Sequence, residues 1–445
     1  MNRTTKQRRY LLIGTGVASI AAAQSIREVD AGAEILIVSD DPHGYYSRPG
    51  LAYYLTGEIN REMLFPFAEK DFRELGITRS HKRIVRILPE AHQVIDQDQQ
   101  VISYERLLIA VGSSAVPFLS NSEQVKGVVK LDHLADADAI LRMARRRQTA
   151  VVVGGGITAL ELAEGLRERG MQVHLILRGS RYWGNVLDLL ESEIVERRLE
   201  QRGISLHKQT KISQLITDKD QLNAVHFQDG STLACRLLTA AIGVRPRLEL
   251  AQGAGIHTDR GILVNEQMQT NLEDIFAAGD CAQVFDPASG MAVLDTLWTP
   301  ARQQGSAAGA NMAGIERSYR RSTPFNVTRL ADIPTTIIGR VGGGVDEDLQ
   351  GIARGDSEIW RLDPFAAVAQ TAHEINRIRL MVGAHTLLGA VIMGEQSLSR
   401  VVYDFIDQQM DITDIRETLL TAGVSLEKVL MEHWEKQRDA NDRPA

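Results

Sequence analysis

The sequence has few cysteines: Cys235 and Cys281 are the only two among 445 residues. They lie far apart and form no CxxC pair, so the sequence supports neither a redox-active cysteine pair nor a cysteine-based metal site. A low cysteine content also fits a reducing compartment, and we expect a cytoplasmic protein without a metal centre of its own.

Long apolar runs are absent as well. No stretch approaches the roughly 20 apolar residues that a membrane-spanning helix needs, so we expect no membrane span. The basic N-terminus leads into a segment that Gly14 and Gly16 interrupt and that soon becomes charged. A signal peptide needs an unbroken apolar core, so we interpret the first residues as a short disordered basic lead.

An excess of positive charge is missing too. The formal net charge is −7, which argues against general binding of nucleic acid. The contents of 44% hydrophobic and 24% charged residues are ordinary for a soluble globular protein. A chain of 445 residues is long enough for two or three domains with large cores.

The most informative stretch runs from Thr149 to Arg178. The apolar run Ala150–Val153 is typical of a buried parallel strand. Gly154, Gly156 and Ala159 then have the spacing G-x-G-x-x-A, a helical pattern follows, and Val173–Leu177 is predicted as the next strand. Such a strand–turn–helix–strand unit offers backbone N–H groups and a helix N-terminus to a pyrophosphate. The alternative is a glycine-rich turn that binds no ligand.

A similar unit opens the chain. Its parts are a strand over Tyr10–Ile13, a turn at Gly14-Thr15-Gly16, a helix over Val17 to about Glu28, and a strand over Ile35–Val38. Ser19 takes the place of the third small residue. Asp40, one residue past the end of the second strand, is the candidate for hydrogen-bonding a ribose hydroxyl. Two such units in one chain predict two dinucleotide-binding sites.

The segments between the two units suggest how the first site is completed. The segment Asp40–Ile59 is predicted as a loop and short helix beyond the carboxyl end of a strand, where ligands bind in open α/β sheets. In it, Arg48 can pair with a phosphate, and Pro49 can bring the backbone close to a flat ring; the alternative is a tyrosine-rich packing loop. Residues 77–101 suggest an antiparallel meander, and Leu107–Gly112 suggests another buried strand.

Six motifs occur in an order that resembles the two-dinucleotide-binding flavoprotein family. They are GTGVAS, YYSRPGLAYYL, LLIAVGSSAVP, VVVGGGITALELA, TAAIGVRPRLEL and IFAAGDCA. The family includes rubredoxin and ferredoxin reductases, the flavin part of NAD(P)H nitrite reductases, and the pyridine nucleotide-disulfide reductases. The similarity covers roughly residues 8–325.

This resemblance implies an FAD site and a nicotinamide site. For FAD it implies the residues Gly14, Gly16, Ser19, Asp40, Arg48, Pro49, Ala110, Gly112, Gly279, Asp280 and Trp298. Asp280 would contact the ribityl chain, although a carboxylate in such a turn is also a common helix N-cap. Trp298 belongs to the segment Leu297–Pro300, which, with the helix that follows it, would close over the pyrimidine end of the flavin.

For the nicotinamide dinucleotide, the resemblance implies Gly154, Gly156 and Glu161. Glu161 would orient the carboxamide or a lysine, or it is simply a carboxylate that the helix dipole favours. An NAD-specific site has an acidic residue at the position of Leu177, which is followed here by Arg178 and then Arg181. Because arginines can clamp a 2′-phosphate, we favour NADPH over NADH.

The expected fold is therefore α/β, with two Rossmann-like three-layer domains and an α+β C-terminal domain with a helical tail. We expect the FAD-binding domain in 1–121 and 246–324, the NAD(P)-binding domain in 122–245, and an interface-type domain in 325–445. In the last, strands are expected near 335–340, 358–362, 377–382 and 387–393, with an acidic loop at 342–348. The helical tail either caps its own sheet or docks a partner.

The expected activity follows from the resemblance. It is an FAD-dependent oxidoreductase that takes a hydride from NAD(P)H and passes electrons to a small iron–sulfur or rubredoxin-like protein, or to a separate metal-bearing subunit. No catalytic acid or base is assigned, since the chemistry belongs to the cofactor. The alternatives are an NAD(P)H oxidase or quinone reductase, and a flavin-bearing assembly subunit whose nicotinamide site has decayed. A homo-oligomer is possible in each case.

Overall fold

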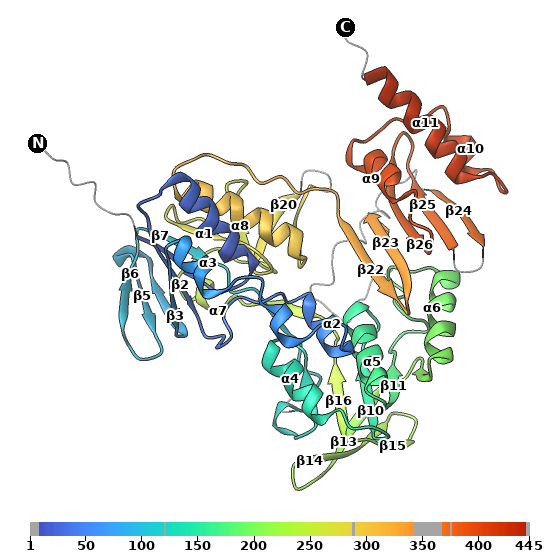
Figure 1. Ribbon diagram of the computed structural model, residues 1–445, viewed down its shortest axis with the longest axis horizontal. Helices are drawn as coiled ribbons and strands as arrows, with labels where there is room; N and C mark the ends of the chain where they lie inside the picture. Colours follow the sequence, from blue (N-terminus) through green and yellow to red (C-terminus); the bar gives the residue numbers. More distant parts are fainter. Residues whose placement is uncertain (1–8, 120–121, 287–289, 342–366, 374–375, 442–445) are drawn as a thin grey trace, which may run out of the picture.

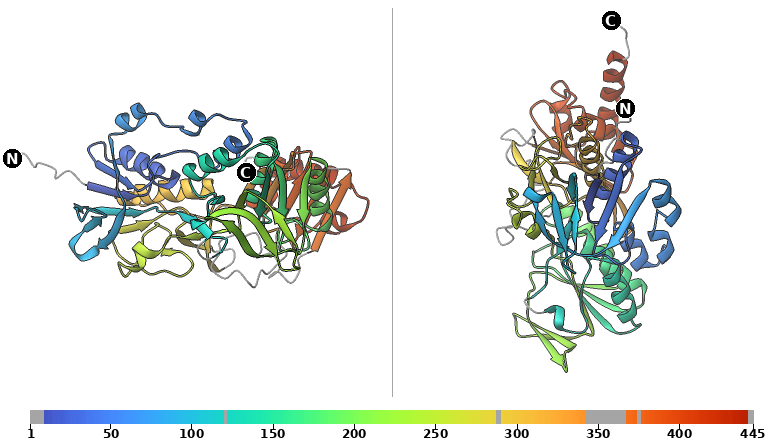
Figure 2. Two further views of the ribbon diagram at one scale, coloured as in Figure 1. Left: turned by 90° about the horizontal axis from the view of Figure 1, so that it is seen from below. Right: turned by 90° about the vertical axis from the view of Figure 1, so that its left-hand side faces the viewer.

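The computed structural model describes residues 9–119, 122–286, 290–341, 367–373 and 376–441. Two parallel sheets with helices packed against them are followed by an antiparallel sheet near the C-terminus (Figure 1). Viewed from a perpendicular direction, the first α/β unit lies at one end of the molecule and the C-terminal sheet at the other (Figure 2). The expected α/β class, with two Rossmann-like sheets and an α+β C-terminal part, is confirmed.

The first parallel sheet combines strands from two distant parts of the chain. In spatial order it contains β19 (Ile275–Ala277), β7 (Arg106–Ile109), β1 (Arg9–Ile13), β2 (Glu34–Ser39) and β3 (Ile77–His81). The centre of β1 is fully buried, because parallel strands are covered by other elements on both faces.

Two helices, α1 (Val17–Val29) and α8 (Trp298–Met312), pack side by side on one face of this sheet. Their close approach depends on two glycines in α8. A Cβ atom on Gly305 would lie 2.1 Å from the carbonyl oxygen of Ala18, and one on Gly309 would lie 2.3 Å from that of Ala22. Larger residues would push the two helices apart.

The predicted meander over residues 77–101 is only partly right. Its first strand, β3, pairs in parallel with β2 and so belongs to the main sheet. The antiparallel sheet consists of β4 (Ile84–Leu88), β5 (Gln93–Asp96) and β6 (Val101–Ser103). Ile77 is a buried core residue, which its place in the parallel sheet explains.

The remaining elements of this unit are short. They are the helices α2 (Gly50–Thr56), α3 (Glu69–Glu74) and α7 (Glu249–Gln252), the strands β18 (Ile262–Val264), β20 (Ala282–Asp286) and β21 (Met291–Leu294), and 3-10 turns at Arg61–Leu64 and Pro89–Ala91. The three strands form one small sheet in the order β18-β20-β21.

The second parallel sheet repeats the design of the first. In spatial order it contains β12 (Ile204–His207), β11 (Gln172–Ile176), β10 (Thr149–Val153), β16 (Leu237–Ala240) and β9 (Val128–Lys130). Its helices are α4 (Leu134–Met143), α5 (Ile157–Glu168) and α6 (Leu189–Gln201), with a 3-10 turn at Ser122–Gln124. An antiparallel sheet of β13 (Ile212–Asp218), β14 (Gln221–Phe227) and β15 (Thr232–Ala234) packs beside it.

Helix α4, the first helix of the second unit, is short. Lys130 ends a strand, and α4 ends at Met143. The arginines 145–147 therefore lie beyond the helix, and Arg147 has a positive φ of 64°. They do not lie in its last turn, where a cation would interact favourably with the helix dipole.

A strand pair and a helix pair are among the contacts that join the α/β units. Strand β8 (Ser113–Ala115) pairs antiparallel with β17 (Val244–Pro246), where the chain leaves and re-enters the first unit. Helix α2 packs directly on α5, because Gly165 allows it: a Cβ there would lie 3.2 Å from the backbone carbon of Leu55.

The C-terminal sheet is antiparallel, in the order β22 (Phe325–Leu330), β23 (Ile333–Gly339), β26 (Leu387–Met393), β25 (Asn376–Val382) and β24 (Ala367–His373). The strands predicted near 335–340, 377–382 and 387–393 are present, whereas β22 and β24 were not predicted. The strand predicted at 358–362, the acidic loop at 342–348 and residues 1–8 of the basic lead lie outside the described residues.

The helical tail packs against the C-terminal sheet. It consists of α9 (Ser399–Asp407), α10 (Arg416–Leu420) and α11 (Leu426–Asn441). Val402 and Phe405 of α9 share one apolar core with Ile338 and Leu380 of the sheet, and Leu430 of α11 joins them. The described part of the tail therefore caps its own sheet. None of the helices in the described ranges is both long and apolar enough to cross a bilayer.

Candidate functional site

The loops at the carboxyl ends of the first sheet lie side by side, since its strands are parallel and adjacent. Along the sheet edge, Gly279 and Asp280 follow β19, Ala110 to Gly112 follow β7, Gly14 to Gly16 follow β1, and Asp40 follows β2. The topology therefore brings four separate sequence motifs to one edge.

The first glycine turn has the shape that a pyrophosphate needs. Gly14 has a φ of 110°, and a Cβ there would lie 2.2 Å from the carbonyl oxygen of Ala110, so only glycine is possible. At Gly16 the surroundings are open: among the described residues, no heavy atom beyond its chain neighbours lies within 4 Å of a Cβ position. This open space at the N-terminus of α1 is a cradle for an anionic group.

Asp280 lies next to this turn, half-buried, and accepts a 2.8 Å hydrogen bond from the Ser113 hydroxyl. Burial raises the pKa of Asp280, although the Ser113 hydrogen bond and the charges of Arg48 and Arg247 oppose this effect. Asp280 precedes β20 and no helix begins there, so the alternative of a helix N-cap is wrong.

Arg48 lies between the two α/β units and not in the first one alone. Its Nη1 donates a 2.8 Å hydrogen bond to the carbonyl oxygen of Asp132, which precedes α4, and its Nη2 lies 3.9 Å from the carboxylate of Asp41. Burial opposes ionisation of Asp41, but contacts with His133, the His43 N–H and Arg48 outweigh it and lower its pKa.

Arg247 is a second arginine at this junction. It donates to the carbonyl oxygen of Val111 at 2.8 Å and forms a 3.1 Å ion pair with Asp132. Arg48 and Arg247 thus both tie Asp132, in the second unit, to the loops of the first.

The other candidates of the first site vary in exposure. Ser19 is fully buried in α1, whereas Pro49, at the start of α2, is exposed. Asp40 is exposed and lies 4.0 Å from Nε of Arg83. Trp298, the first residue of α8, is 44% exposed, so its ring is available at the surface.

The second glycine turn follows the same plan. Gly154 has a φ of 147°, and a Cβ there would lie 2.3 Å from the carbonyl oxygen of Ala241. The surroundings of Gly156 differ from those of Gly16, because a Cβ there would lie 4.0 Å from Nε1 of Trp183. The indole of Trp183 therefore borders the space in front of the N-terminus of α5.

Glu161 lies in the second turn of α5, since the helix begins at Ile157. It is beyond the first turn, where a helix dipole acts most strongly, which disfavours the purely dipolar interpretation. Burial, together with repulsion from Glu164, raises the pKa of Glu161 to about 7. This side chain can thus hold a proton near neutral pH.

Beyond β11, the acidic position of an NAD-specific site is taken by Leu177, which is buried. Arg178 follows and is exposed. Arg181 turns back onto its own loop, where its Nη2 donates a 2.9 Å hydrogen bond to the carbonyl oxygen of Gly184. Arg178 and Arg181 thus both lie in the segment that follows β11.

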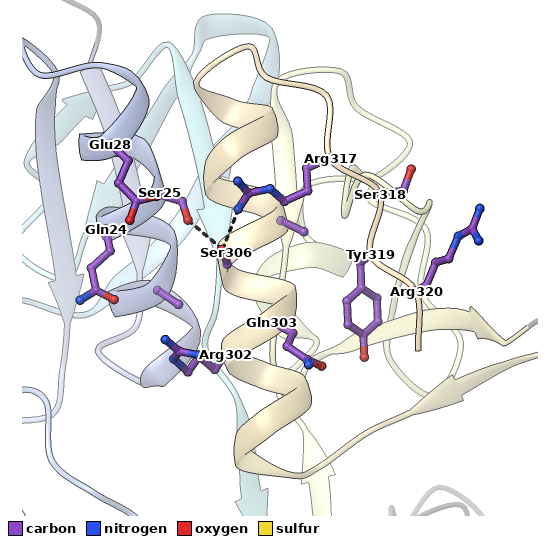
Figure 3. Close-up of a pocket in the computed structure, with 12 residues that line it drawn as sticks. Gln24, Ser25, Glu28, Arg302, Gln303, Ser306, Arg317, Ser318, Tyr319 and Arg320 are labelled. Carbon is purple, nitrogen blue, oxygen red and sulfur yellow. Dashed lines mark hydrogen bonds between the residues drawn. The ribbon is translucent and has the colours of Figure 1, made fainter. Parts of the chain in front are cut away.

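Away from both glycine turns, a cavity of about 370 Å³ opens between the C-terminal half of α1 and helix α8 (Figure 3). Arg317 reaches into it and donates a 2.9 Å hydrogen bond to the hydroxyl of Ser306, which also pairs with Ser25. Within the part of the chain that the structure describes, no group of three potential metal ligands is found.

Two parallel sheets, each with a glycine turn open toward a helix N-terminus, define a protein of the class that binds two dinucleotides. The profile of the pyridine nucleotide-disulphide oxidoreductase family matches residues 8–305, which is more than half of the chain. The chain belongs to this family, and the predicted resemblance is confirmed.

Three relatives illustrate the range of the family. The assimilatory nitrate reductase electron transfer subunit of Bacillus subtilis is 31% identical over 76% of this chain and 43% of its own length. The NADH oxidase of Methanocaldococcus jannaschii is 30% identical, over 73% of this chain and 74% of its own length. The rubredoxin-NAD(+) reductase of Acinetobacter baylyi is 30% identical over 62% of this chain and 72% of its own length.

The chain spans about half the length of some relatives, such as the nitrate reductase subunit. Among solved structures, a ferredoxin reductase from Rhodopseudomonas palustris has a TM-score of 0.81, with 23% identity over 95% of this chain and 100% of its own. This similarity supports the fold.

Sequence reasoning missed several residues at these sites. Ser113 and Arg247 act through contacts between distant segments. Gln304 is fully buried in α8 and accepts a 2.8 Å hydrogen bond from the Gly279 N–H. Trp183 was missed as well; a lone tryptophan shortly after a strand of the second unit was its only signal.

Proposed function

We propose that the protein is an FAD-dependent oxidoreductase that is reduced by NAD(P)H and passes electrons to a separate acceptor. The observation that carries the proposal is the pair of glycine turns, in which Gly16 and Gly156 each leave room for a ligand group at a helix N-terminus. Segments 1–121 and 246–324 would hold FAD, 122–245 would hold the nicotinamide dinucleotide, and 325–445 would be an interface-type domain.

The residues of the first sheet edge fit FAD. The N–H groups at the start of α1 would bind its pyrophosphate, and Asp40 would bind the adenosine ribose. The Asp280 carboxylate, oriented by Ser113, would accept hydrogen bonds from the ribityl hydroxyls. When bound, FAD supplies a ring that accepts the two electrons of a hydride and can release them one at a time.

The residues of the second sheet edge fit a nicotinamide dinucleotide. The N–H groups at the start of α5 would bind its pyrophosphate, and Glu161 would orient the carboxamide through a hydrogen bond. NADPH is favoured over NADH, because the buried Leu177 offers a ribose no carboxylate and the exposed Arg178 offers a 2′-phosphate a cation. Arg181, three residues further along the same loop, would be a second cation for this phosphate.

The acceptor would be a small iron–sulfur or rubredoxin-like protein, or a metal-bearing subunit. Rubredoxin reductase and the nitrate reductase electron transfer subunit among the relatives support this proposal. Trp298 and Tyr53, which are 44% and 45% exposed, are the aromatic side chains that such a partner would meet.

A second candidate is an NAD(P)H oxidase, which the similarity to an archaeal NADH oxidase favours. The two candidates differ in what reoxidises the protein. After loading with FAD, the chain would be reduced with NADPH in the absence of oxygen and then mixed with rubredoxin, a [2Fe–2S] ferredoxin, a quinone or oxygen. Rapid reoxidation by one of the proteins supports the main proposal, whereas rapid reoxidation by oxygen alone supports the second.

A further inference from the structure

A loop after β11 borders the second glycine turn. A Cβ atom placed on Gly156 would lie 4.0 Å from Nε1 of Trp183, and one on Gly155 would lie 3.9 Å from the backbone nitrogen of Trp183 and 3.7 Å from Leu177. The indole N–H therefore lies next to the backbone that would bind a pyrophosphate. No residue takes this place at Gly16 in the first unit, within the described ranges.

Trp183 has an unusual backbone conformation, with a φ of 46°. Bulky residues adopt such values rarely, and the resulting strain persists only where neighbouring contacts enforce it. Here the neighbours do so. The Tyr182 N–H donates to Glu196 at 2.7 Å, and the Tyr182 carbonyl accepts a 2.7 Å hydrogen bond from Ser192. The carbonyl of Trp183 accepts bonds from two later N–H groups of the loop.

The same loop is held from outside its own unit. Arg379, on β25 of the C-terminal sheet, donates a 2.7 Å hydrogen bond to the carbonyl oxygen of Val186. Its Nε also bonds Glu191 at 2.8 Å, and Arg377 pairs with Asp188 and Glu191. Asp188 and Glu191 form the capping box of α6, directly after the loop.

This connection is buried, which makes it stiff. Glu191 is 0% exposed, Arg377 is 2% exposed and Arg379 is 5% exposed. Figure 1 shows α6 beside the C-terminal sheet, with the rest of the second unit on its other side. Separating such a pair would leave an uncompensated buried charge, which is strongly unfavourable. The loop and the sheet are therefore expected to move together.

We propose that Trp183 forms one wall of the nicotinamide dinucleotide site, where its indole N–H donates to the pyrophosphate, and that Arg379 of the C-terminal sheet is a positioning residue for it. This proposal rests on the proposed function, which assigns the second glycine turn to that dinucleotide. It gives the C-terminal sheet a part in cofactor binding in addition to any contact with a partner.

The test measures binding of NADP⁺ to the FAD-loaded full chain by calorimetry, with NAD⁺ as a second probe. Trp183→Phe keeps an aromatic ring and removes the N–H, so the dissociation constant should rise about tenfold. Trp183→Ala removes both and should raise it about a hundredfold. Trp434→Phe is the matched control: its N–H bonds Asp404 in the C-terminal tail, and NADP⁺ binding should not change.

Tryptophan fluorescence gives an independent readout of contact. NADP⁺ should quench part of the emission of the wild type and of Trp434→Phe, and this part should be lost in Trp183→Phe.

The role of Arg379 is tested by the double variant Arg379→Met/Glu191→Gln, which leaves no unpaired buried charge. It should retain FAD, and its circular dichroism should show an unchanged fold. It should bind NADP⁺ about tenfold more weakly than the wild type, and NADP⁺ should quench less of its tryptophan fluorescence. Arg379→Lys alone keeps the positive charge for Glu191 and should recover part of the affinity. If the double variant does not fold, Arg379→Lys is measured in its place. An affinity for NADP⁺ equal to that of the wild type would then overturn the positioning role of Arg379.

The outcomes separate the two proposals. If the wild type binds NADP⁺ or NAD⁺ and both Trp183 variants bind within twofold of it, the wall formed by Trp183 is refuted and the proposed function survives. If the wild type binds neither nucleotide, the proposed function fails, and this inference fails with it.

Discussion

The two α/β units solve the same geometric problem with different surroundings. Both place a glycine with a positive φ, Gly14 or Gly154, where a Cβ would clash with a carbonyl oxygen of a neighbouring strand's loop. Both then place a second glycine at the N-terminus of a helix. In the first unit this glycine faces open space, whereas in the second it faces Trp183.

The residues after the second strand differ as well. Asp40 and Asp41 follow β2, whereas Leu177 and Arg178 follow β11. The shared backbone explains how each unit can accept a pyrophosphate, while the differing side chains explain how each can select the rest of its ligand. Under the proposed function, the backbone would set the class of ligand and the flanking side chains would set its identity.

The largest expected effect comes from a matched pair, Gly16→Val and Gly156→Val. Both glycines have negative φ values that valine can adopt and have room for a Cβ, so both variants should fold. Gly16→Val should lose FAD and purify without colour. Gly156→Val should keep FAD but lose at least about a hundredfold in its rate of reduction by NADPH, because the valine fills the space of the pyrophosphate.

Flavin content and stopped-flow absorbance measure the two effects. Loss of flavin from Gly156→Val, with retention by Gly16→Val, would reverse the assignment of the two sites.

A second pair compares how the helices pack. Gly305→Ala should destabilise the protein by about 3 kcal/mol, because its Cβ would lie 2.1 Å from the carbonyl oxygen of Ala18. Gly165→Ala should change stability by less than about 1 kcal/mol, since its nearest contact is 3.2 Å and alanine favours the helix. Urea unfolding of the FAD-loaded protein measures both, and equal effects would contradict the stated packing.

The residues after the strands provide the third test. Arg178→Glu should lower the preference for NADPH over NADH by about ten- to a hundredfold, because it replaces a partner of the 2′-phosphate with a like charge. Arg197→Glu, on the exposed face of α6, makes the same change in net charge and should leave the preference unaltered. The ratio of kcat/KM for the two nucleotides is the measurement, and an unchanged ratio removes Arg178 from the site.

The smallest effect concerns Glu161. Its pKa rises from 4.5 to about 7 on folding, so the folded state keeps a proton that the unfolded chain releases. The contribution of Glu161 to stability is therefore present below pH 4.5 and is lost as the pH rises through 7. Glu161→Gln cannot ionise, and it should gain about 1 kcal/mol over the wild type at pH 8 and much less at pH 5.

Thermal unfolding at the two pH values checks this difference. If Glu161→Gln gains the same stability at pH 5 and at pH 8, ionisation of Glu161 is not the cause of the gain.

Much of the fold was predictable because the units repeat a local pattern. Apolar strands, glycine spacing and helical periodicity predicted β1, α1 and β2, and likewise β10, α5 and β11. The strand β3 was assigned wrongly, because most of its residues are exposed, as in a meander, while its pairing partner, β2, is far away in the sequence.

Residues of the candidate sites were predictable only where they belong to a sequence motif. The glycines and Asp280 came from motifs, and the sheet order brings the loops of the first site to one edge. By contrast, Arg48 meets Asp132, Asp280 meets Ser113, and Val186 meets Arg379 across long separations in sequence. Such contacts are decided by how the units pack, which no local pattern encodes.

The central claim is that one chain binds FAD and a nicotinamide dinucleotide in the two related units. The most direct measurement is an anaerobic titration of the FAD-loaded chain with NADPH and with NADH, followed by flavin absorbance. The account predicts a yellow protein that about one equivalent of NADPH bleaches, with NADH needing a higher concentration. A colourless protein after FAD loading, or a yellow protein that neither nucleotide bleaches, would contradict it.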